Sequence, residues 1–207
     1  MSNPDFAADD RRNVGFYTEL VAQHGVHPHS LNWGSTESQR LRFDVLAKAG
    51  LQAGDSVLDV GCGLGDFYGW IRERGLVVDY RGVDLTPKMI EVARSRFPEG
   101  HFDVLNVLEA EVAPADFVVA SGIFYLRQHE PIVFMQQVLT RLFALCRRTV
   151  AFNTLSAWSP DTDANEFYAD PLRTLEFCRS LTPWVVLRHD YHPRDFTIYL
   201  HREAQRP

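Results

Sequence analysis

The sequence has few of the features that mark a secreted, metal-binding or membrane protein. Its three cysteines, Cys62, Cys146 and Cys178, are far apart and have neither the spacing of a zinc site nor that of a disulfide framework. The first ten residues lack the positive segment and the apolar run of a signal peptide, and no apolar run is long enough to cross a bilayer. We therefore expect a cytoplasmic protein with buried free thiols, no metal and no membrane partner.

Basic residues are outnumbered by acidic ones. The 207 residues include 21 Lys and Arg against 27 Asp and Glu, which gives a formal net charge of −6. Proteins that bind nucleic acids draw most of their affinity from Lys and Arg side chains that neutralise phosphates. The charge therefore argues against a nucleic-acid partner and favours a small-molecule substrate, with phosphate-free or cationic molecules fitting best. A homodimer stays open as an assembly.

No linker rich in Pro, Gly or Ser divides the chain, and no repeat or low-complexity segment interrupts it. Hydrophobic residues make up 45% of the sequence, which is enough for a full core in one compact unit. Strand-like and helix-like segments alternate after residue 50, which predicts an α/β fold with a doubly wound sheet. The predicted strands are 56–60, 77–84, 101–105, 116–120, 149–153, 184–189 and 196–202, and the predicted helices include 36–49, 87–97, 131–146 and 171–180.

The most informative segment is the run VLDVGCGLGDF at residues 57–67, where an apolar strand leads into three alternate glycines and then into a helix. Side chains at Gly61, Gly63 and Gly65 would block close approach of a ligand to the main chain. Glycine also tolerates the positive φ that a tight strand-to-helix turn requires. The segment is typical of a site that binds a nucleoside-bearing ligand.

Acidic residues around this turn indicate which ligand it binds. Asp66 occupies the third glycine position of the pyrophosphate fingerprint G-x-G-x-x-G, and Asp59 precedes the turn. Two carboxylates would repel a pyrophosphate and attract an ammonium or sulfonium group, which favours S-adenosylmethionine (SAM) over NAD. Asp84 ends the next predicted strand 19 residues after Gly65, at the spacing from which an acidic side chain reaches a ribose hydroxyl pair.

The runs VLDVGCGLGDF and GVDLTPKMIEVAR resemble motifs I and II of the class I SAM-dependent methyltransferases, and the resemblance covers residues 57 to about 150. It implies a Rossmann-like sheet of seven strands with an antiparallel last strand. It also implies that Asp59 and the glycines at 61, 63 and 65 lie beside the methionine part of SAM, and that Asp84 holds the ribose.

Further positions complete the expected cofactor site. The family usually has an Asp after the third strand that accepts the adenine amino group, and here that place falls on Asn106, whose amide oxygen can accept the same bond. We also expect Leu85, Val107 and Ser121 at the cofactor. Residues 120–125 lack the Asn/Asp-Pro-Pro-aromatic sequence that methylases of base amino groups use there, which argues further against DNA or RNA as substrate.

Residues 1–50 lie outside the expected SAM-binding domain, which spans residues 51–207. In related enzymes such N-terminal helices form a lid that closes over SAM, so we expect a helical lid here, with Trp33 and Gln39 at the cofactor. The alternative is that the aromatic side chains of the first helix and Trp33 simply pack that helix on the core.

A helix start is predicted close to this segment. Thr36-Glu37-Ser38-Gln39 reads as a capping box, and its helix N-terminus could receive the methionine carboxylate of SAM. We expect Leu41, Val45 and Ala49 on the buried face of this helix and Gly50 at its end.

The chemistry should be decided at the ends of the fourth and fifth predicted strands. Phe124 and Tyr125 follow the fourth strand, where a ring can face the sulfonium, and we expect one of these two adjacent rings to reach the ligand. Tyr125 could also orient a nucleophile through its hydroxyl. Asn153 ends the fifth strand, where its amide either holds a polar group of the substrate or begins a turn. His129 is the candidate general base if the reaction needs one.

Methyl transfer from SAM requires mainly that a nucleophile be held in line with the sulfonium methyl. We therefore expect a SAM-dependent methyltransferase that acts on a small molecule. With the segments LNWGSTESQRLRF, FYADPLRTLEFC and RHDYHPRDFTIYL, the whole chain resembles a group of small bacterial proteins that are usually labelled methyltransferases on the core alone. It is also similar to azetidine-2-carboxylate synthases, which keep this fold, cyclise SAM and release methylthioadenosine, and SAM cyclisation is therefore the second reading. A SAM-binding regulator without catalysis is the third reading.

Overall fold

The computed structural model describes residues 6–32 and 34–205. The helices are α1 (Ala7–His24), the short 3-10 helix η1 (Pro28–Leu31), α2 (Thr36–Ala47), α3 (Asp66–Glu73), α4 (Pro87–Arg96), α5 (Pro131–Ala144) and α6 (Pro171–Leu181). The strands are β1 (Ser56–Val60), β2 (Asp79–Asp84), β3 (His101–Val104), β4 (Ala115–Ser121), β5 (Cys146–Leu155), β6 (Val185–Arg188) and β7 (Asp195–His201).

The described strands form one seven-stranded sheet in the order β3-β2-β1-β4-β5-β7-β6. Strands β3, β2, β1, β4 and β5 are parallel, and β7 runs antiparallel to both β5 and β6. The predicted doubly wound sheet with an antiparallel last strand is confirmed. The strand order reverses between β1 and β4, and in such sheets ligands bind at the carboxyl ends of the strands beside this switch point.

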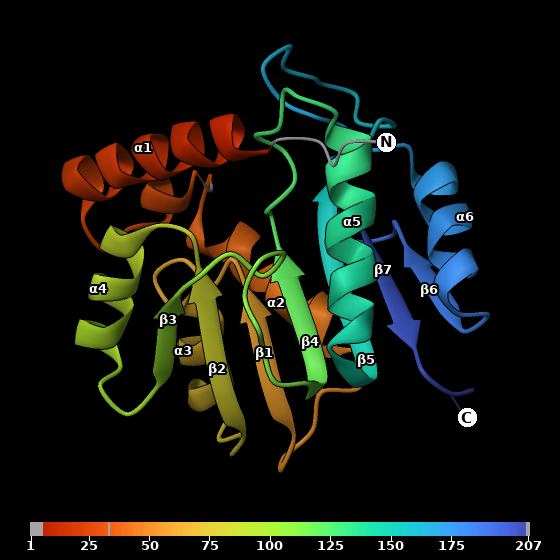
Figure 1. The fold of residues 1–207 in the computed structure, drawn as a ribbon, viewed down its shortest axis with the longest axis horizontal. Helices are drawn as coiled ribbons and strands as arrows, with labels where there is room; N and C mark the ends of the chain where they lie inside the picture. The colour runs from red at the N-terminus through yellow and green to blue at the C-terminus, as the bar shows by residue number, and fades with distance from the viewer. Residues whose placement is uncertain (1–5, 33, 206–207) are drawn as a thin grey trace.

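Helices cover both faces of the sheet (Figure 1). One hydrophobic cluster joins one face to side chains of α2, α3 and α4, among them Phe43, Phe67 and Ile90. A second cluster joins the other face to α5 and α6 through residues such as Leu139 and Cys178. Central strands are buried on both sides, as parallel sheets require.

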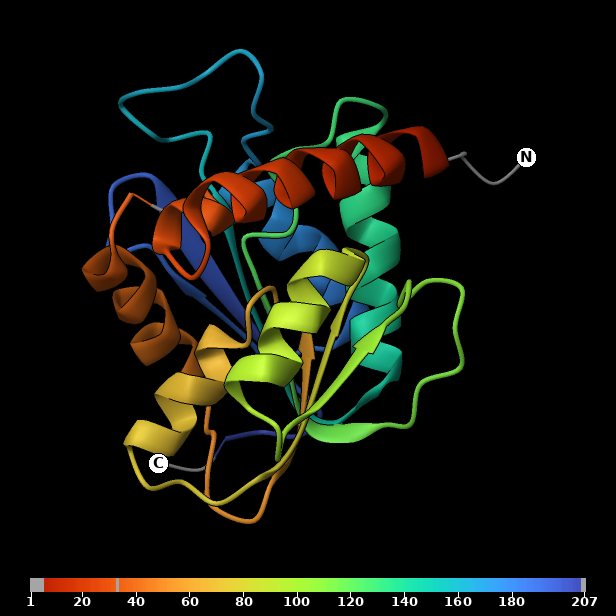
Figure 2. The same cartoon turned by 90° about the vertical axis from the view of Figure 1, so that its left-hand side faces the viewer.

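Helix α1 lies across the carboxyl ends of the parallel strands, above the layer formed by α4 and the sheet (Figure 2). It packs on η1 and α4. Helix α2, in contrast, packs against α3, β5 and β7 and belongs to the layer that covers the sheet. The first 50 residues therefore divide into an upper part, α1 with η1, and a helix of the core. The prediction of a lid stays a prediction for the upper part.

The start of α2 differs from expectation by one residue. Ser35 is the N-cap, and its hydroxyl accepts a hydrogen bond from the Ser38 amide. Ser35 has the extended backbone of a capping residue, whereas Thr36 already lies within the helix. Val45 is buried as predicted, but Leu41 is 37% exposed, so its expected place on the buried face was wrong.

Among the described residues, no helix combines the length and the apolar character that are needed to span a membrane.

Candidate active site

The turn between β1 and α3 has the conformation that its glycines predict. Gly61 and Gly63 have φ values of +76° and +53°, where a side chain would be strained. A Cβ on Gly61 would lie 2.2 Å from Cγ2 of Ile123, and one on Gly63 would lie 2.6 Å from Cδ2 of Leu31. A ligand can therefore approach the backbone of this turn only because both positions lack side chains.

Asp84 at the end of β2 fixes this turn. One carboxylate oxygen accepts a hydrogen bond from the Gly63 amide at 3.0 Å, and the other accepts one from the Thr86 amide at 2.8 Å. Burial raises the pKa of Asp84, and these two amide donors oppose that shift. The carboxylate that we expect at the ribose therefore also connects the end of β2 to the glycine turn.

Asp59 is buried beneath the turn. The Tyr80 hydroxyl donates a hydrogen bond of 2.6 Å to its carboxylate. Burial raises the pKa of Asp59 to about 7, and the negative charges of Asp84 and Asp66 add to the shift. A cation in the pocket would favour the ionised form of Asp59.

Asp66 contributes less charge to the pocket than the sequence suggests. Its carboxylate pairs with Arg96 at 2.6 Å, and the Gln39 side-chain amide donates a hydrogen bond to it at 3.2 Å. The guanidinium neutralises most of this charge. The preference for a cationic ligand thus depends mainly on Asp59 and Asp84.

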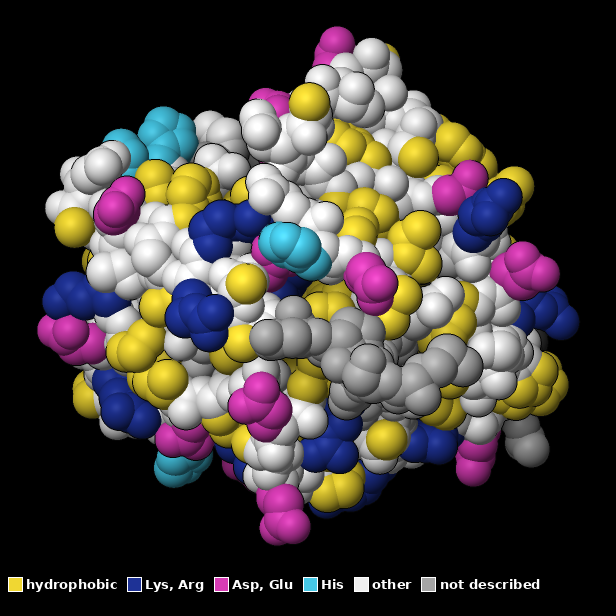
Figure 3. All heavy atoms as spheres, turned by 45° about the horizontal axis from the view of Figure 1, so that its top comes forward, with side chains coloured by type: hydrophobic (Ala, Val, Ile, Leu, Met, Phe, Trp, Pro, Cys, Tyr) yellow, Lys and Arg dark blue, Asp and Glu magenta, His cyan; other side chains and the backbone are white. Residues whose placement is uncertain are grey.

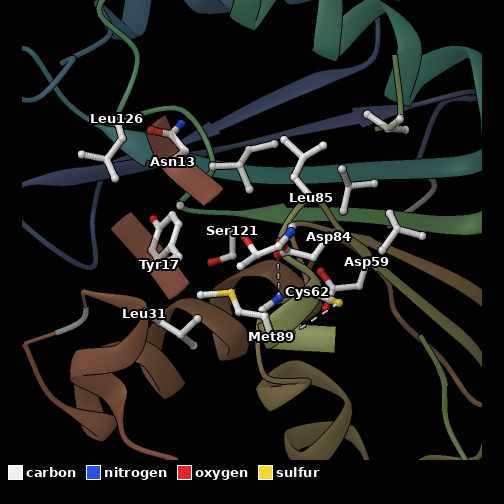
Figure 4. A pocket seen from close by; sticks show the side chains of 18 of the residues that line it. Asn13, Tyr17, Leu31, Asp59, Cys62, Asp84, Leu85, Met89, Ser121 and Leu126 are labelled. Atoms are coloured by element: carbon white, nitrogen blue, oxygen red, sulfur yellow. Dashed lines mark hydrogen bonds between the residues drawn. The ribbon is translucent and has the colours of Figure 1, made fainter. Parts of the chain in front are cut away.

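These groups surround a cavity of about 150 Å³ at the carboxyl ends of β1, β2 and β4. In Figure 4, Asn13 and Tyr17 of α1 lie on one side of this cofactor pocket, and Asp84, Asp59 and Cys62 lie on the other. The pocket brings together ten of the residues that the sequence predicts, namely Gln39, Asp59, Gly61, Gly63, Asp84, Leu85, Asn106, Val107, Ser121 and Tyr125. Gly65 lies next to the pocket as the left-handed N-cap of α3.

Three polar side chains meet where α1 crosses the loop after β4. The Tyr17 and Tyr125 hydroxyls lie 2.8 Å apart, and the Asn32 side-chain amide donates a hydrogen bond of 3.2 Å to Tyr125. Burial raises the pKa of both tyrosines, so they stay protonated. Of the two adjacent aromatic residues after β4, Tyr125 is the one that lines the pocket.

Asn106 connects the loop after β3 to α1. Its amide oxygen accepts a hydrogen bond from the Leu108 amide at 3.0 Å, and its nitrogen donates to Asp10 at 3.3 Å. Asp10 also pairs with the buried Arg127 at 2.5 Å. A carbonyl oxygen has two lone pairs, so Asn106 keeps an acceptor position for an adenine amino group.

One predicted residue lies in the core instead of the pocket. Phe124 is 1% exposed and packs on Phe134 and Phe152, with ring centroids 6.3 and 5.9 Å apart. Its expected place beside the sulfonium was wrong, because its ring packs in the hydrophobic core, whereas Tyr125 lines the pocket. Trp33, which was also expected at the cofactor, lies outside the described residues.

Asn153 and His129 lie outside the cofactor pocket and have partners within the protein. The Asn153 oxygen accepts from the Gly122 amide at 2.9 Å, and its nitrogen donates to the Ser121 hydroxyl at 3.2 Å. The His129 ring is two-thirds exposed and lies 2.9 Å from the Asp9 carboxylate. The catalytic roles that the sequence analysis assigns to both residues stay predictions.

The sequence analysis expected N-terminal helices near the cofactor but did not name the residues of α1 that line the pocket. Asn13 and Tyr17 line the pocket, and Asp9 and Asp10 fasten the helix to the loop after β4. Aspartates in a first helical turn are common for a different reason, since they favour the helix dipole. Only the spacing of Asn13 and Tyr17, one turn apart, could have indicated a shared face.

This fold and this pocket together define the class of the protein, which is that of doubly wound proteins that bind a nucleoside. The chain matches the methyltransferase domain family over residues 57–148. A Mycobacterium tuberculosis protein, Rv1506c, which is named as a methyltransferase, is 34% identical over 157 residues, covering 72% of this chain and 94% of the relative. The trans-aconitate 2-methyltransferase of Rhizobium rhizogenes is 35% identical over 91 residues, which span 42% of this chain and 35% of that enzyme.

Solved structures share the fold at low sequence identity. The magnesium protoporphyrin IX methyltransferase of Synechocystis PCC 6803 with bound S-adenosylhomocysteine (SAH) superposes with a TM-score of 0.67 at 13% identity, covering 94% of this chain and all of that one. The DhpI–SAH complex has a TM-score of 0.65 at 16% identity over the whole of both chains. The [4+2]-cyclase SpnF has a TM-score of 0.63 at 16% identity, covering 86% of this chain and 72% of that one.

The chain belongs to the class I SAM-dependent methyltransferases, and SAM is its cofactor.

Proposed function

We propose that this enzyme transfers the SAM methyl group to a small molecule by in-line attack. The observation that carries the proposal is the place of α1 in the wall of the cofactor pocket, where the Tyr17 hydroxyl lies 2.8 Å from the Tyr125 hydroxyl. An enclosed site excludes water and large substrates, and it holds two reactants in a fixed geometry. Tyr125 and Ser121 stand where the acceptor would meet the cofactor.

Bound SAM supplies an activated methyl group. A lone pair of the acceptor forms the new bond to the methyl carbon, while the carbon–sulfur bond breaks and its electrons stay on sulfur in SAH. The chain's own residues position the reactants: Asp84 with the glycine turn fixes the nucleoside, Asp59 faces the cationic part, and Tyr125 borders the acceptor side. Because SAM supplies the activated methyl group and the residues only position the reactants, the reaction needs no strong base.

The charge of the protein supports a small acceptor. Its formal net charge is −6, and acidic and basic side chains are interspersed on the face seen in Figure 3. A polyanionic substrate would require a continuous basic surface. The partial match to trans-aconitate 2-methyltransferase, whose name states a small carboxylic acid as substrate, agrees with this proposal.

SAM cyclisation is the second candidate. The mainly apolar pocket with Tyr17 and Tyr125 at its border would suit a reaction in which SAM is the sole substrate. The fold likeness to the [4+2]-cyclase SpnF supports the view that this fold can house reactions other than methyl transfer.

Mass spectrometry of the purified protein with SAM separates these functions. In the first arm the protein is incubated with SAM alone, and in the second arm small carboxylic acids, amines and phenols are added. We expect SAM to persist in the first arm and SAH with a methylated product to form in the second. Methylthioadenosine above the non-enzymatic rate in the first arm would establish cyclisation instead. Intact SAM in both arms, with SAM bound, would favour a regulator.

A further inference from the structure

A second chamber of about 290 Å³ lies beside the cofactor pocket. Leu31, Gly122 and Tyr125 line both cavities and thus form the border between them. The rest of the wall comes mainly from the start of α2, the end of β5 and the loop that leads into β7. It includes five charged or titratable side chains, which are Arg42, Glu166, His192, Arg194 and Asp195.

The sheet places this chamber at the same end as the cofactor pocket. Ser121, which lines the cofactor pocket at the end of β4, pairs with Asn153 of β5. Two residues further along β5, Leu155 pairs with Asp195, the first residue of β7. Neighbouring strands lie about 4.8 Å apart, so roughly 10 Å separate β4 from β7 at this end. A small molecule in the second chamber can therefore extend from the loop before β7 to the cofactor.

Asp195 orients the imidazole of His192. The His192 Nδ1 lies 2.8 Å from the Asp195 carboxylate, which also forms an ion pair with Arg42. The Arg194 amide lies 3.2 Å from the same nitrogen, and a neutral ring cannot satisfy both groups. The contact with the carboxylate is shorter and charge-assisted, so it places the proton on Nδ1. The lone pair of the neutral ring is then on Nε2.

The Nε2 atom of His192 is available to a ligand. The side chain is 25% exposed, and within the described part of the chain Nε2 makes no hydrogen bond and is not buried. Burial and the Arg42 guanidinium lower the pKa of His192, Arg194 adds to this shift, and Asp195 opposes it. The ring is therefore neutral at pH 7, and Nε2 can accept a proton.

The other charged groups of this wall pair with one another. Arg42 pairs with Asp195, and Arg194 lies 3.3 Å from the Glu166 carboxylate. With His192 neutral, these five side chains carry no net charge. A carboxylate or an ammonium group would lose hydration here without gaining an unpaired counter-ion, whereas a neutral hydroxyl would not. The wall therefore favours an acceptor that carries its nucleophile as O–H.

We propose that His192 is the general base that takes the proton of a hydroxyl acceptor bound in the second chamber, and that Asp195 is its positioning residue. The inference rests on the proposed methyl transfer and specifies its acceptor class. The acceptor oxygen forms the bond to the methyl carbon while the carbon–sulfur electrons stay on sulfur. The O–H electrons stay on oxygen, and the proton moves to Nε2. Asp195 stabilises the resulting imidazolium, which then releases the proton to water.

Nitrogen-15 NMR on protein saturated with SAH locates the proton without any acceptor. His192→Asn identifies the His192 signals and keeps a donor to Asp195, because its amide nitrogen takes the place of Nδ1. We expect the Nδ1–H tautomer at pH 7 and a titration below the usual value of 6.5. Asp195→Asn should increase the share of the Nε2–H tautomer, a change that a purely structural role would not produce. An Nε2–H tautomer or a charged ring at pH 7 in the parent would overturn the general base.

The pH profile of methyl transfer tests the proton transfer itself. The probes are phenol, catechol and benzyl alcohol, and SAH formation is measured by mass spectrometry. At pH 7 we expect His192→Asn to lower kcat about a hundredfold and to change KM less than threefold. The loss should shrink at high pH for phenol and catechol, because these acceptors then ionise in solution.

His101→Asn, at the exposed start of β3, is the matched control and should keep the kcat of the parent. Neither His101 nor His192 lines the cofactor pocket, so all three proteins should bind SAH equally by calorimetry. Equal SAH binding would show that a lower kcat in His192→Asn does not reflect unfolding.

The outcomes separate this inference from the proposed function. A kcat in His192→Asn equal to that of the parent, a loss confined to KM, or SAH formed only from carboxylic acids or amines would overturn His192 as the base for a hydroxyl acceptor. Absence of SAH formation from every acceptor, in a parent protein that binds SAM and shows the Nδ1–H tautomer, would instead contradict the proposed function.

Discussion

The Tyr17 hydroxyl of α1 lies 2.8 Å from the Tyr125 hydroxyl, a contact between residues 108 positions apart in the sequence. Near the start of the same helix, the Asp9 carboxylate accepts hydrogen bonds from the Gln128 and His129 amides at 3.1 and 3.0 Å. Helix α1 is therefore fastened to the loop after β4 at two places, near its start and in its interior.

Tyr17→Phe removes one attachment without changing the ring. A single hydrogen bond contributes about 0.5–1.5 kcal/mol, so we expect SAH to dissociate roughly three- to tenfold faster. Stopped-flow displacement of SAH measures this rate. Tyr68→Phe is the control, because Tyr68 lies on α3, partly buried against a hydrophobic cluster, and does not line the pocket. Equal dissociation rates in Tyr17→Phe and the parent would show that the hydrogen bond does not hold the cofactor in place.

Gly63→Ala tests the turn that faces the cofactor. The positive φ of +53° predicts a loss of about 1–2 kcal/mol in the free energy of unfolding. The added Cβ would also collide with Leu31, 2.6 Å away, and we expect at least tenfold weaker SAH binding by calorimetry. Gly75→Ala has a similar φ of +68° with open space around it. It should lose similar stability but bind SAH normally, and matched binding losses in both variants would refute the specific role of Gly63.

Asp84→Asn replaces one acceptor oxygen by an amino group. That group would face the N–H of Gly63 or of Thr86, which now donate to Asp84 at 3.0 and 2.8 Å. We expect SAH and methylthioadenosine to weaken together by about ten- to hundredfold, because both contain the ribose. Asp79→Asn, at the exposed start of the same strand, serves as control. Undiminished affinity for both ligands in Asp84→Asn would contradict the ribose assignment.

The pH dependence of binding should report on Asp59. Its pKa rises from 3.8 to about 7 through burial, so the folded protein keeps a proton that the unfolded chain releases. The stabilisation associated with that proton is present at low pH and is lost as the pH rises through about 7. The ammonium group of SAH prefers the ionised carboxylate, so we expect its affinity to increase about tenfold between pH 6 and pH 8.

Calorimetry with two ligands isolates this effect. Methylthioadenosine lacks the amino acid part of SAH, and its affinity should change little over the same pH range. Asp59→Asn cannot ionise, so it should abolish the pH dependence for SAH. An equally steep pH profile in Asp59→Asn would assign the titration to another group.

The fold was predictable to a large extent because its signals are local. Gly61, Gly63 and Asp84 each occupy a place that the chain geometry around them requires, and the strands after residue 50 alternate with helices in the expected order. The cap of α2 was displaced by one residue, since Ser35 and Thr36 both have side chains that can cap.

The acceptor side of the site was less predictable because it depends on long-range contacts. Asn153 was expected at the end of the fifth strand, but β5 continues to Leu155, and Ser121 and Gly122 bind the Asn153 amide. His129 is separated from the pocket by the attachment of α1 through Asp9.

The position of β7 also affects how the chain is made. Strand β6 pairs with no strand other than β7 in the described sheet, and β7 is buried along all seven of its residues. A ribosome delivers β6 first, so β6 and the outer edge of β5 stay unpaired until β7 emerges. The cofactor half, β1 to β4, is complete long before this. A nascent chain stopped ahead of Asp195 would carry every residue that lines the cofactor pocket but would lack the strand that joins β6 to β5.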